Sequence, residues 1–271
     1  MLEAKLIETK EYINAKTNIK PRYGLILGSG LGGLVEEMEI DSIFEYADIP
    51  NFLVSTAIGH AGRLVFGRIS DTPIVVMQGR FHYYEGYDMQ DIVYPVRLMA
   101  YLGVETLIVT NAAGGLDPSY KAGDIMLIED QISMMPQNPL IGKNHDFLGP
   151  RFPDMSNAYD RDLRQKVRSI AQDLNIPIQE GVYLSTPGPF FETSAERRYM
   201  HFIGANAVGM STAPEVIAAN HAGLKVIGFS AITNVATGGE EQMADDSDEV
   251  IEVANVIGPK IAQIISEILK N

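Results

Sequence analysis

The sequence predicts an α/β fold, a single domain with a central mixed, largely parallel β-sheet flanked by helices. Short apolar runs alternate along the chain with stretches of helical spacing, which is the order expected of strands and helices that build such a sheet. Most of the apolar runs end in a turn of small residues. Since no internal repeat, linker or change of composition divides the chain, we expect residues 1–271 to form one domain.

The N-terminal part of the chain predicts strands between two helices. Leu2, Leu6 and Ile13 fall at helical spacing between charged residues and indicate a surface helix. Apolar runs bounded by turn residues indicate the strands, and Gly103 is a usual stop signal for the second helix. The expected helices are 2–15 and 91–102, and the expected strands are 24–27, 64–69 and 74–77.

The C-terminal part alternates in the same way. A β-branched strand, 106–110, runs into a small-residue turn, 111–115. The stretch 129–158 is rich in proline and glycine and lacks periodicity, which is typical of functional or flexible loops. The remaining expected elements are a helix at 160–174, a strand at 181–184 with a turn at 185–189, a short strand at 207–210, a helix near 213–222, a strand at 226–232 and a last helix from about Ser247.

The ends of these strands predict where a ligand would lie. In open α/β sheets, ligands collect beyond the carboxyl ends of the strands. We therefore expect the turns that follow the strands to form one site. The last residues before these turns are Leu27, Met77, Thr110, Leu184, Val208 and Ile232.

Composition excludes several classes of function. With 35 acidic and 21 basic residues, the formal net charge is −14, and such a surface repels a phosphate backbone, so we expect no nucleic-acid partner. The absence of cysteine excludes disulfides, thiolate zinc sites, iron–sulfur clusters and thiol catalysis. We find no apolar N-terminal stretch and no run of about 18 apolar residues, so we expect no signal peptide, no membrane span and a cytoplasmic location.

The turn 28–33 matches the pattern G-x-G-x-x-G and has three interpretations. A dinucleotide site requires a following helix and an acidic residue about 20 positions further on, where Asp48 stands. A tight strand-to-helix turn without a ligand is the second. In the third, backbone N–H groups and the Ser29 hydroxyl hold a lone phosphate.

Arg80, His82 and Tyr84 follow a predicted strand. If the strand continues, they alternate to the same side, where an arginine and a histidine would clamp an oxyanion. The alternative is an arginine tied to a structural carboxylate such as Glu85. His60 stands between glycines in an expected loop, where the sequence is equally compatible with a solvated imidazole and with a ligand-binding one.

The segment 209–213 nearly matches the nucleophile elbow G-x-S-x-G, with Ser211 at the serine position. A serine hydrolase needs a histidine downstream. His221 falls on the helix that directly follows and would face elsewhere. We therefore favour an anion-binding or helix-capping Ser211 over a nucleophile.

Glu192 and Asn234 are candidates for binding a flat heterocycle. Glu192 follows a Pro-Gly-Pro turn beside two aromatic residues, and its carboxylate can accept hydrogen bonds from N–H donors. Asn234 ends an apolar strand, and its amide can both donate and accept. The alternatives are a first-turn charge of the following helix for Glu192 and an ordinary turn residue for Asn234.

The acidic stretch 240–249 contains no basic residue. A divalent-metal site is one interpretation of it. We favour a solvated loop whose acids stabilise the N-terminus of the last helix. Since the histidines at 145, 201 and 221 show no ligand spacing, we expect no metal site.

Seven segments, in this order and with matching spacing, carry a resemblance to a known family. They are Gly28-Ser29-Gly30-Leu31-Gly32, Gly59-His60-Ala61-Gly62-Arg63-Leu64, Gln78-Gly79-Arg80-Phe81-His82, Thr110-Asn111-Ala112-Ala113-Gly114-Gly115, Gly188-Pro189-Phe190-Phe191-Glu192-Thr193, Val208-Gly209-Met210-Ser211-Thr212 and Ile232-Thr233-Asn234. From about residue 20 to beyond 250, the chain closely resembles the trimeric, low-molecular-mass purine nucleoside phosphorylases.

This resemblance implies a phosphorylase/hydrolase-like fold and a homotrimer. It also implies reversible phosphorolysis in purine salvage: a purine nucleoside and inorganic phosphate give the free purine and (deoxy)ribose 1-phosphate. The implied partners are therefore small molecules. Phosphate is a co-substrate, and the family's chemistry needs no cofactor.

The resemblance further implies roles for individual residues. Asn234, Glu192 and His82 would be catalytic. Phosphate would be held by Ser29, His60, Arg80, His82, the Ala112 backbone and Ser211. The ribose would lie against Tyr84, Met210 and Ser247, and the purine against Glu192, Asn234, Phe191, Val208, Ala113 and Gly114. Phe152, in the proline-rich stretch, would reach the site of a neighbouring subunit.

Hydrogen-bonding polarity then predicts the substrate. A carboxylate at Glu192 accepts from the N1–H of inosine and from the N1–H and 2-amino group of guanosine, whereas N1 of adenine is itself an acceptor. We therefore expect a preference for 6-oxopurine nucleosides. A donor at the purine's N7 side, Asn234, would stabilise the departing base. The related methylthioadenosine phosphorylases resemble the chain less, since they carry an aspartate at the Asn234 position and lack the glutamate.

One position departs from the family pattern. Many members carry a histidine near the sugar 5′-hydroxyl where this chain has Ser247. We expect Ser247 either to bind that hydroxyl through water or to cap the last helix, and 5′-modified nucleosides to be tolerated. The rival functions are a nicotinamide-dependent dehydrogenase built on 28–33 and Asp48, and a nucleoside-binding protein without catalysis.

Overall fold

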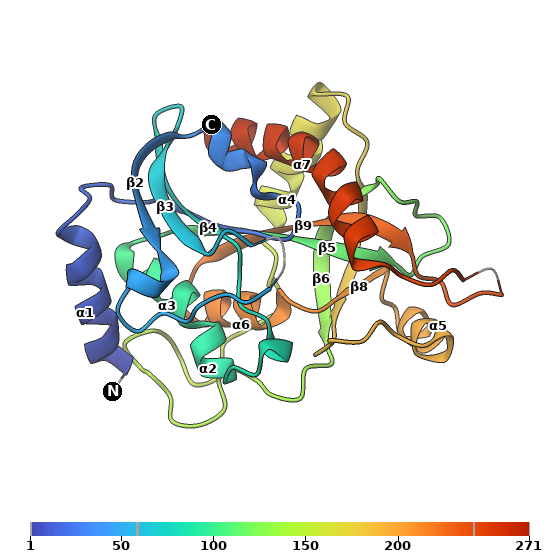
Figure 1. Cartoon of the computed structure of the whole chain (residues 1–271), viewed down its shortest axis with the longest axis horizontal. Helices are drawn as coiled ribbons and strands as arrows, with labels where there is room; N and C mark the ends of the chain where they lie inside the picture. Colours follow the sequence, from blue (N-terminus) through green and yellow to red (C-terminus); the bar gives the residue numbers. More distant parts are fainter. Residues whose placement is uncertain (1, 58–59, 241, 271) are drawn as a thin grey trace.

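A nine-stranded sheet forms the centre of the computed structural model, which describes residues 2–57, 60–240 and 242–270 (Figure 1). The strands are β1 (Tyr23–Leu27), β2 (Glu39–Glu45), β3 (Arg63–Ile69), β4 (Thr72–Gln78), β5 (Thr106–Gly115), β6 (Ile125–Ser133), β7 (Gln179–Ser185), β8 (Ala207–Gly209) and β9 (Lys225–Val235). Their order is β2-β3-β4-β1-β5-β8-β7-β6-β9, and β5 also pairs with β9. This further pairing closes β5, β8, β7, β6 and β9 into a ring.

The sheet is mixed. The neighbours β4, β1, β5 and β9 run parallel, and β6, β7 and β8 run parallel to one another in the opposite direction. The two groups meet in antiparallel pairs, β5 with β8 and β6 with β9, and β3 is antiparallel to both β2 and β4. The predicted α/β class with a mixed, largely parallel sheet is therefore confirmed.

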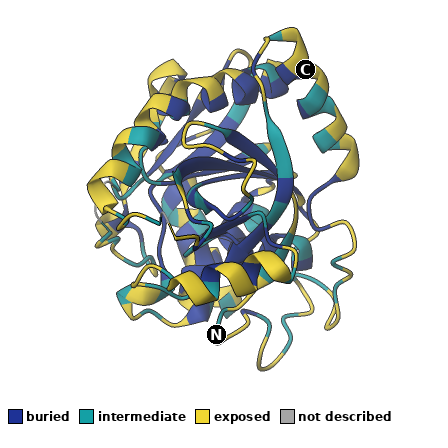
Figure 2. Cartoon of the chain, turned by 90° about the vertical axis from the view of Figure 1, so that its right-hand side faces the viewer, coloured by how far each residue is buried: buried dark blue, intermediate teal, exposed yellow. Residues whose placement is uncertain are grey.

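Helices cover both faces of the sheet (Figure 1). One face carries α1 (Leu2–Asn14), α2 (Met89–Ile92), α3 (Tyr94–Leu102) and α6 (Ala213–His221), and the other carries α4 (Arg161–Asp173) and α7 (Ser247–Lys270), while α5 (Ser194–Phe202) lies beyond the ring. Three short 3₁₀ helices span Gly32–Glu37, Tyr46–Asp48 and Tyr83–Glu85. Buried apolar side chains fill the space between each helical layer and the sheet, and exposed residues gather on the outer faces (Figure 2). Among the described helices, none combines the length and the apolar character that crossing a lipid bilayer requires.

Most helices expected from apolar spacing are confirmed to within one or two residues at each end. Gly103 does end α3, with φ of 100° and its N–H bonded to the carbonyls of Met99 and Ala100. The single helix expected at 91–102 is instead two helices, α2 and α3, which meet at Val93. Pro95 lies in the first turn of α3, where its missing N–H costs nothing, so the break falls just before it.

The turn expected at 111–115 is wrong, because β5 continues through it. The backbone from Asn111 to Gly115 pairs with β9, and Gly114 and Gly115 also pair with β8. The small residues serve close packing rather than turning: a Cβ on Gly114 would lie 2.9 Å from the Cβ of Ala236. The strand β9 is also longer than expected, because its residues Asn234 and Val235 pair with Gly114 and Gly115. Asn234 therefore lies within a strand and not in a turn.

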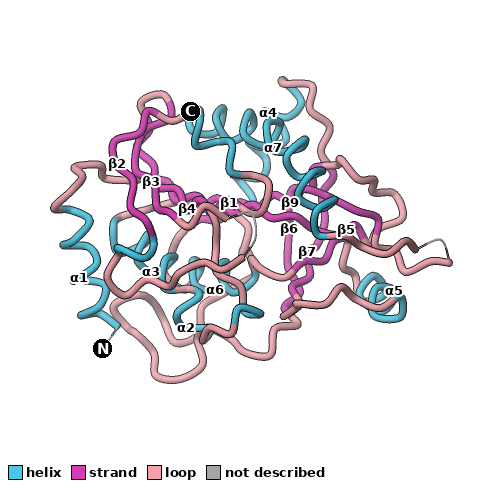
Figure 3. The backbone as a smooth tube through the Cα atoms, viewed as in Figure 1, coloured by secondary structure: helices cyan, strands magenta, loops and turns pink. Residues whose placement is uncertain are grey.

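The proline-rich stretch is irregular, as expected, but it begins later. Residues 129–133 belong to β6, and the chain then runs without helix or strand to α4, which begins at Arg161. Figure 3 draws this stretch as a long loop below the sheet. Phe152, in its middle, is 86% exposed in the single chain.

Candidate active site

A cavity of about 440 Å³ opens where the ends of six strands come together. Residues that follow β1, β4, β7 and β8, residues of the distal halves of β5 and β9, and the first turn of α7 line it. Of the predicted site residues, it contains Ser29, Arg80, His82, Tyr84, Ala112, Ala113, Gly114, Phe191, Glu192, Val208, Met210, Ser211, Asn234 and Ser247. His60 and Phe152 are not in its lining. All six of the segments expected to meet contribute to this one cavity, although 111–115 and 233–234 lie within strands and not in turns.

The reason for this convergence differs from the one expected. Strands β7 and β8 run against β5, so their carboxyl ends do not share an edge with it. Because β5 extends to Gly115, β8 can pair with its far end, and a Cβ on Gly209 would lie 3.2 Å from the carbonyl oxygen of Ala112. The extension of β5 therefore brings the β8 turn to the same cavity.

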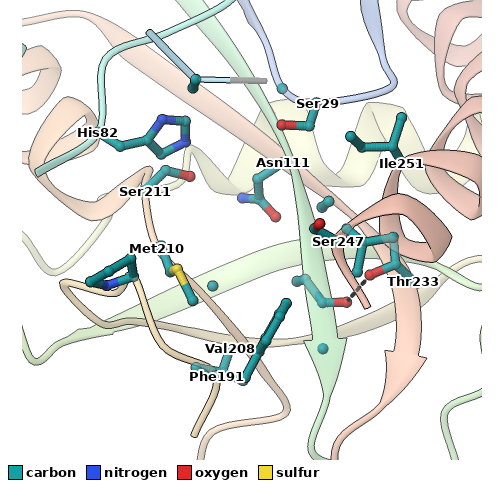
Figure 4. A pocket seen from close by; sticks show the side chains of 18 of the residues that line it. Ser29, His82, Asn111, Phe191, Val208, Met210, Ser211, Thr233, Ser247 and Ile251 are labelled. Carbon is teal, nitrogen blue, oxygen red and sulfur yellow. Dashed lines mark hydrogen bonds between the residues drawn. The ribbon is translucent and has the colours of Figure 1, made fainter. Parts of the chain in front are cut away.

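The cavity has two chemically different ends (Figure 4). The arginine end consists of Ser29, Arg80, His82 and Ser211, and the glutamate end consists of Phe191, Glu192, Val208 and Asn234. In the view of Figure 4, Ser29, His82 and Ser211 lie on one side and Phe191 and Val208 on the other, with Met210 and Ser247 between them.

Arg80 is 1% exposed and organises the arginine end. Its Nη1 donates to Ser211 Oγ at 2.7 Å and to the Thr212 hydroxyl at 3.1 Å, and its Nη2 donates to the Thr110 carbonyl at 2.6 Å. Its Nε lies 3.6 Å from Glu215 Oε1. Arg80 is thus tied to a structural carboxylate, but to Glu215 rather than to the expected Glu85, and it lines the cavity at the same time.

The expected alternation of Arg80 and His82 along a strand is wrong. Strand β4 ends at Gln78, and Gly79 has φ of 110°, a left-handed conformation that glycine adopts without strain. A Cβ on Gly79 would also lie 2.7 Å from the Cβ of His60. This turn, and not strand periodicity, brings both side chains to the cavity.

His82 is held by stacking and by Glu85. Its ring stacks on Tyr84 at 4.7 Å between centroids, and its Nδ1 lies 3.4 Å from Glu85 Oε1. Burial tends to raise the pKa of Glu85, but hydrogen bonds from His82 and Thr56 outweigh burial and hold this pKa at about 2. Burial lowers the pKa of His82, so the imidazole is a neutral group at the arginine end.

His60 lies one step behind the cavity wall. Its Nε2 is 3.3 Å from Ser29 Oγ, and its Nδ1 is 3.0 Å from the Arg80 carbonyl. Burial and the neighbouring His82 and Arg80 lower the pKa of His60 to about 4. The imidazole is therefore half-buried and outside the cavity lining, where it contacts the Ser29 hydroxyl. Gly59, its neighbour in the quoted motif, lies outside the described residues.

The glycine-rich turn lacks two features that a dinucleotide site needs. A 3₁₀ helix, Gly32–Glu37, follows it in place of an α-helix, and Asp48 is exposed in another 3₁₀ helix outside the cavity lining. Gly30 has φ of 72°, and its Cβ would lie 2.6 Å from the Cβ of Ala254. At Gly30 a glycine is therefore required because the turn packs directly against α7.

The arrangement around Ser211 does not suit a serine nucleophile. His221 lies at the far end of α6 and lines a different cavity of about 460 Å³, where its Nε2 is 3.1 Å from Asn144 Oδ1. The simple capping role is also wrong, because Thr212, with φ of 70°, is the residue before α6. Ser211 instead turns its hydroxyl to Arg80, which leaves the anion-binding interpretation.

The glutamate end combines a buried carboxylate with an amide. Glu192 Oε1 accepts from the Thr186 hydroxyl at 3.5 Å, and burial raises the pKa of Glu192, although Arg197 acts in the opposite direction. Asn234 Oδ1 accepts from the Thr233 hydroxyl at 3.0 Å. The two side chains offer a heterocycle both acceptors and a donor.

Sequence reasoning missed two residues that support this end. Arg197, on α5, is buried, and its Nε lies 3.9 Å from Glu192 Oε2. Asp245 forms an ion pair with Arg197 and accepts a hydrogen bond from Asn234 Nδ2 at 2.6 Å. The expectation that all the acids of 240–249 are solvated is therefore wrong for Asp245, and Glu241 lies outside the described residues. No spacing signal in the sequence could have selected one of several neighbouring acids.

Two further residues that the sequence did not single out, Val250 and Ile251, line the cavity from the first turn of α7. Together with Ser247, which stands where many family members have a histidine, they form an apolar wall with one hydroxyl. Within the described residues, no group of three histidine, aspartate or glutamate side chains could hold a metal ion.

The model of the phosphorylase superfamily matches residues 22–270. The chain is 53% identical to purine nucleoside phosphorylase 1 of Bacillus subtilis over 92% of each protein, and 49% identical to bovine purine nucleoside phosphorylase over 96% of this chain and 92% of that one. Among solved structures, isoform 2 of the Schistosoma mansoni purine nucleoside phosphorylase with cytosine and ribose-1-phosphate has a TM-score of 0.94 at 41% identity, covering 99% of this chain and 96% of that one. The Schistosoma enzyme with hypoxanthine has a TM-score of 0.93 at 37% identity, covering 99% of this chain and 97% of that one.

Proposed function

The chain belongs to the purine nucleoside phosphorylase family, and from this premise we propose that it prefers 6-oxopurine nucleosides in purine salvage. Inosine, guanosine and their deoxy forms would react with inorganic phosphate to give the free base and (deoxy)ribose 1-phosphate. The single observation that carries the proposal is the cavity with a buried arginine at one end and a buried carboxylate and amide at the other.

The arginine end suits phosphate. Arg80 supplies the positive charge, and the hydroxyls of Ser29 and Ser211 together with the Ala112 backbone supply further hydrogen-bonding groups. His82 also lines this end. Its neutral imidazole has one N–H, which donates to phosphate when the proton is on Nε2, because Nδ1 faces Glu85. A guanidinium surrounded by N–H and O–H donors is what an anion needs in a chain of net charge −14, although Glu215 balances the charge of Arg80.

Between the two ends, the ribose would lie against Tyr84, Met210 and Ser247. A phosphate oxygen forms the new bond to C1′ while the bond from C1′ to N9 breaks. The electron pair of the broken bond goes to the purine, which takes up a proton, and positive charge develops on the sugar in the transition state. Phosphate stabilises that charge from one face, and Asn234 stabilises the leaving base through a hydrogen bond at N7.

The glutamate end supports the proposed preference for 6-oxopurines. The Glu192 carboxylate accepts from the N1–H of hypoxanthine or guanine, while adenine would place its N1 acceptor against the carboxylate. Phe191 and Val208 would pack on the faces of the base, and Ala113 and Gly114 leave room for it. We also propose that the enzyme acts as a cytoplasmic homotrimer without a cofactor.

The test is to incubate the protein with inosine, with and without phosphate, and to measure hypoxanthine. We expect release that requires phosphate and a kcat/KM for guanosine and inosine at least tenfold above that for adenosine, in line with the loss caused by one mismatched polar pair. Release that ignores phosphate would identify a hydrolase and refute the proposal. A rise of the melting temperature with NAD, but not with phosphate plus hypoxanthine, would favour a dehydrogenase.

A further inference from the structure

Asn234 is held from both sides of its amide. Its Nδ2 donates to Asp245 Oδ1 at 2.6 Å, and its Oδ1 accepts from the Thr233 hydroxyl at 3.0 Å. The Thr233 hydroxyl has one proton, and the Ala113 carbonyl at 3.3 Å competes for it. An ionised Asp245, by contrast, can only accept. Asp245 is therefore the group that decides which way the amide points.

Asp245 also holds the buried guanidinium of Arg197. Arg197 is 2% exposed, and its ion pairs within the described chain are those with Asp245 and Glu192. The pair with Asp245 is a direct hydrogen bond from Nη2, whereas Glu192 stays 3.9 Å from Nε. Because Asp245 takes the charge of Arg197, the Glu192 carboxylate remains available to a ligand.

Burial separates Asp245 from its acidic neighbours. Its side chain is 7% exposed, while Asp246 and Asp248 are exposed to solvent. Three parts of the chain meet at this carboxylate: α5, β9 and the segment before α7. The contact is therefore a tertiary one and not a local turn.

We propose that Asp245 is a positioning residue for the leaving base: it turns an N–H of Asn234 toward N7 of the purine and keeps Arg197 from neutralising Glu192. The inference rests on the proposed function and assigns a positioning role to a residue that does not itself line the purine site. If the amide turned over, its carbonyl oxygen would face the nitrogen on which negative charge develops, and the hydrogen bond would become a repulsion. The loss would be greatest in the transition state, where that charge is largest.

The test compares inosine with 7-methylinosine in the wild type and in three variants. The N7 of 7-methylinosine is already substituted, so its base leaves uncharged and needs no donor there. Asp245→Ala removes both functions of the carboxylate. Asp245→Asn keeps an acceptor for Asn234 but removes the charge that holds Arg197. Asp248→Asn is the matched control, because Asp248 is an exposed acid of the same segment.

We expect Asp245→Ala to lower kcat on inosine by roughly 10- to 100-fold, less than the loss of a whole transition-state donor because Asn234 itself remains. It would also raise the KM of inosine, because Arg197 is freed to turn to Glu192. The same variant would lose less than about threefold in kcat on 7-methylinosine. Asp245→Asn would mainly raise the KM of inosine, because Arg197 then turns to Glu192. Asp248→Asn would match the wild type on both substrates.

Equal losses of kcat on the two substrates, or an Asp245→Ala variant with the kcat of the wild type on inosine, would overturn the inference. If the wild type does not cleave 7-methylinosine, inosine alone decides: a kcat of Asp245→Ala well below that of Asp245→Asn supports the inference, and equal kcat values of the two variants refute it. Circular dichroism melting of each variant checks that the fold is kept. Failure of the proposed function is a separate result, since the wild type would then not release hypoxanthine with phosphate.

Discussion

At the scale of single residues, Arg80 combines two tasks that a lysine could not. Its guanidinium is buried, with Nε near Glu215 and both Nη groups donating to fixed acceptors. A planar group with five donors can satisfy a carboxylate, a carbonyl and a hydroxyl and still present charge to the cavity, whereas an ammonium group has three donors on one atom. The charge of the arginine end therefore depends on a residue that is also part of the core.

Protonation of His60 is the prediction that belongs to this scale. Its pKa is lowered to about 4, first by burial and then by His82 and Arg80. We expect its imidazole to stay neutral from pH 8 down to about pH 4, measured by NMR titration of the ring and assigned with His60→Gln. Since the unfolded chain binds this proton below about pH 6.5, His60 should reduce stability progressively as the pH falls from about 6.5 to 4.

The outcome that contradicts this prediction is a His60 titration near pH 6.5. It would mean that water reaches the ring and that burial does not lower the pKa of His60. His60→Gln should also remove part of the loss of stability between pH 6.5 and pH 4 in denaturation measurements.

At the scale of elements, α7 closes one wall of the cavity. Its position is set by the glycine-rich turn, because any side chain on Gly30 would collide with Ala254. The first turn of α7 then places Ser247, Val250 and Ile251 in the lining. These residues would face the 5′ end of a bound sugar, and a serine is too short to replace the reach of an imidazole.

Recognition of the 5′-hydroxyl is therefore expected to be weak. We predict that 5′-deoxyinosine is cleaved with a kcat/KM less than about tenfold below that of inosine, the loss of one neutral hydrogen bond of about 1 kcal/mol. Ser247→His should widen the gap between the two substrates, because an imidazole can donate directly. Asp248→His, one position further on, serves as the control. A 100-fold gap in the wild type would show that the 5′ end is already bound tightly.

At the scale of the whole molecule, the site depends on the closed ring of strands. The pairings of β5 with β1, β8 and β9 bring together side chains that are far apart in the sequence, such as Ser29 and Asn234. The same scale includes the proposed trimer. Phe152 projects from the proline-rich stretch and lies outside the lining of its own cavity.

We predict that sedimentation gives a mass of three chains and that Phe152→Ala raises the KM of inosine on the order of tenfold, the effect of removing part of a buried phenyl contact. Phe202 is the matched control, because it is 87% exposed and lies outside the cavity lining. Phe202→Ala should leave KM unchanged. A monomer with wild-type activity, or equal effects of the two variants, would refute the subunit contribution of Phe152.

Local patterns in the sequence determined most of the elements, although not β2 and β6, and also the acidic charge balance and the set of segments that meet at the cavity. Apolar spacing is a local property, so strands such as β1 and β3 and helices such as α1 and α4 were predictable. It fails where pairing is non-local: the small residues 111–115 resemble a turn, and only contact with β8 and β9 makes them a strand.

The tertiary structure alone decided the partners of the buried charges. That Arg80 meets Glu215 and not Glu85, and that Asp245 but not Asp246 or Asp248 holds Asn234 and Arg197, depends on which elements pack together. The energy of a charge depends on its burial and on its neighbours in space, and a sequence specifies neither until the chain has closed on itself.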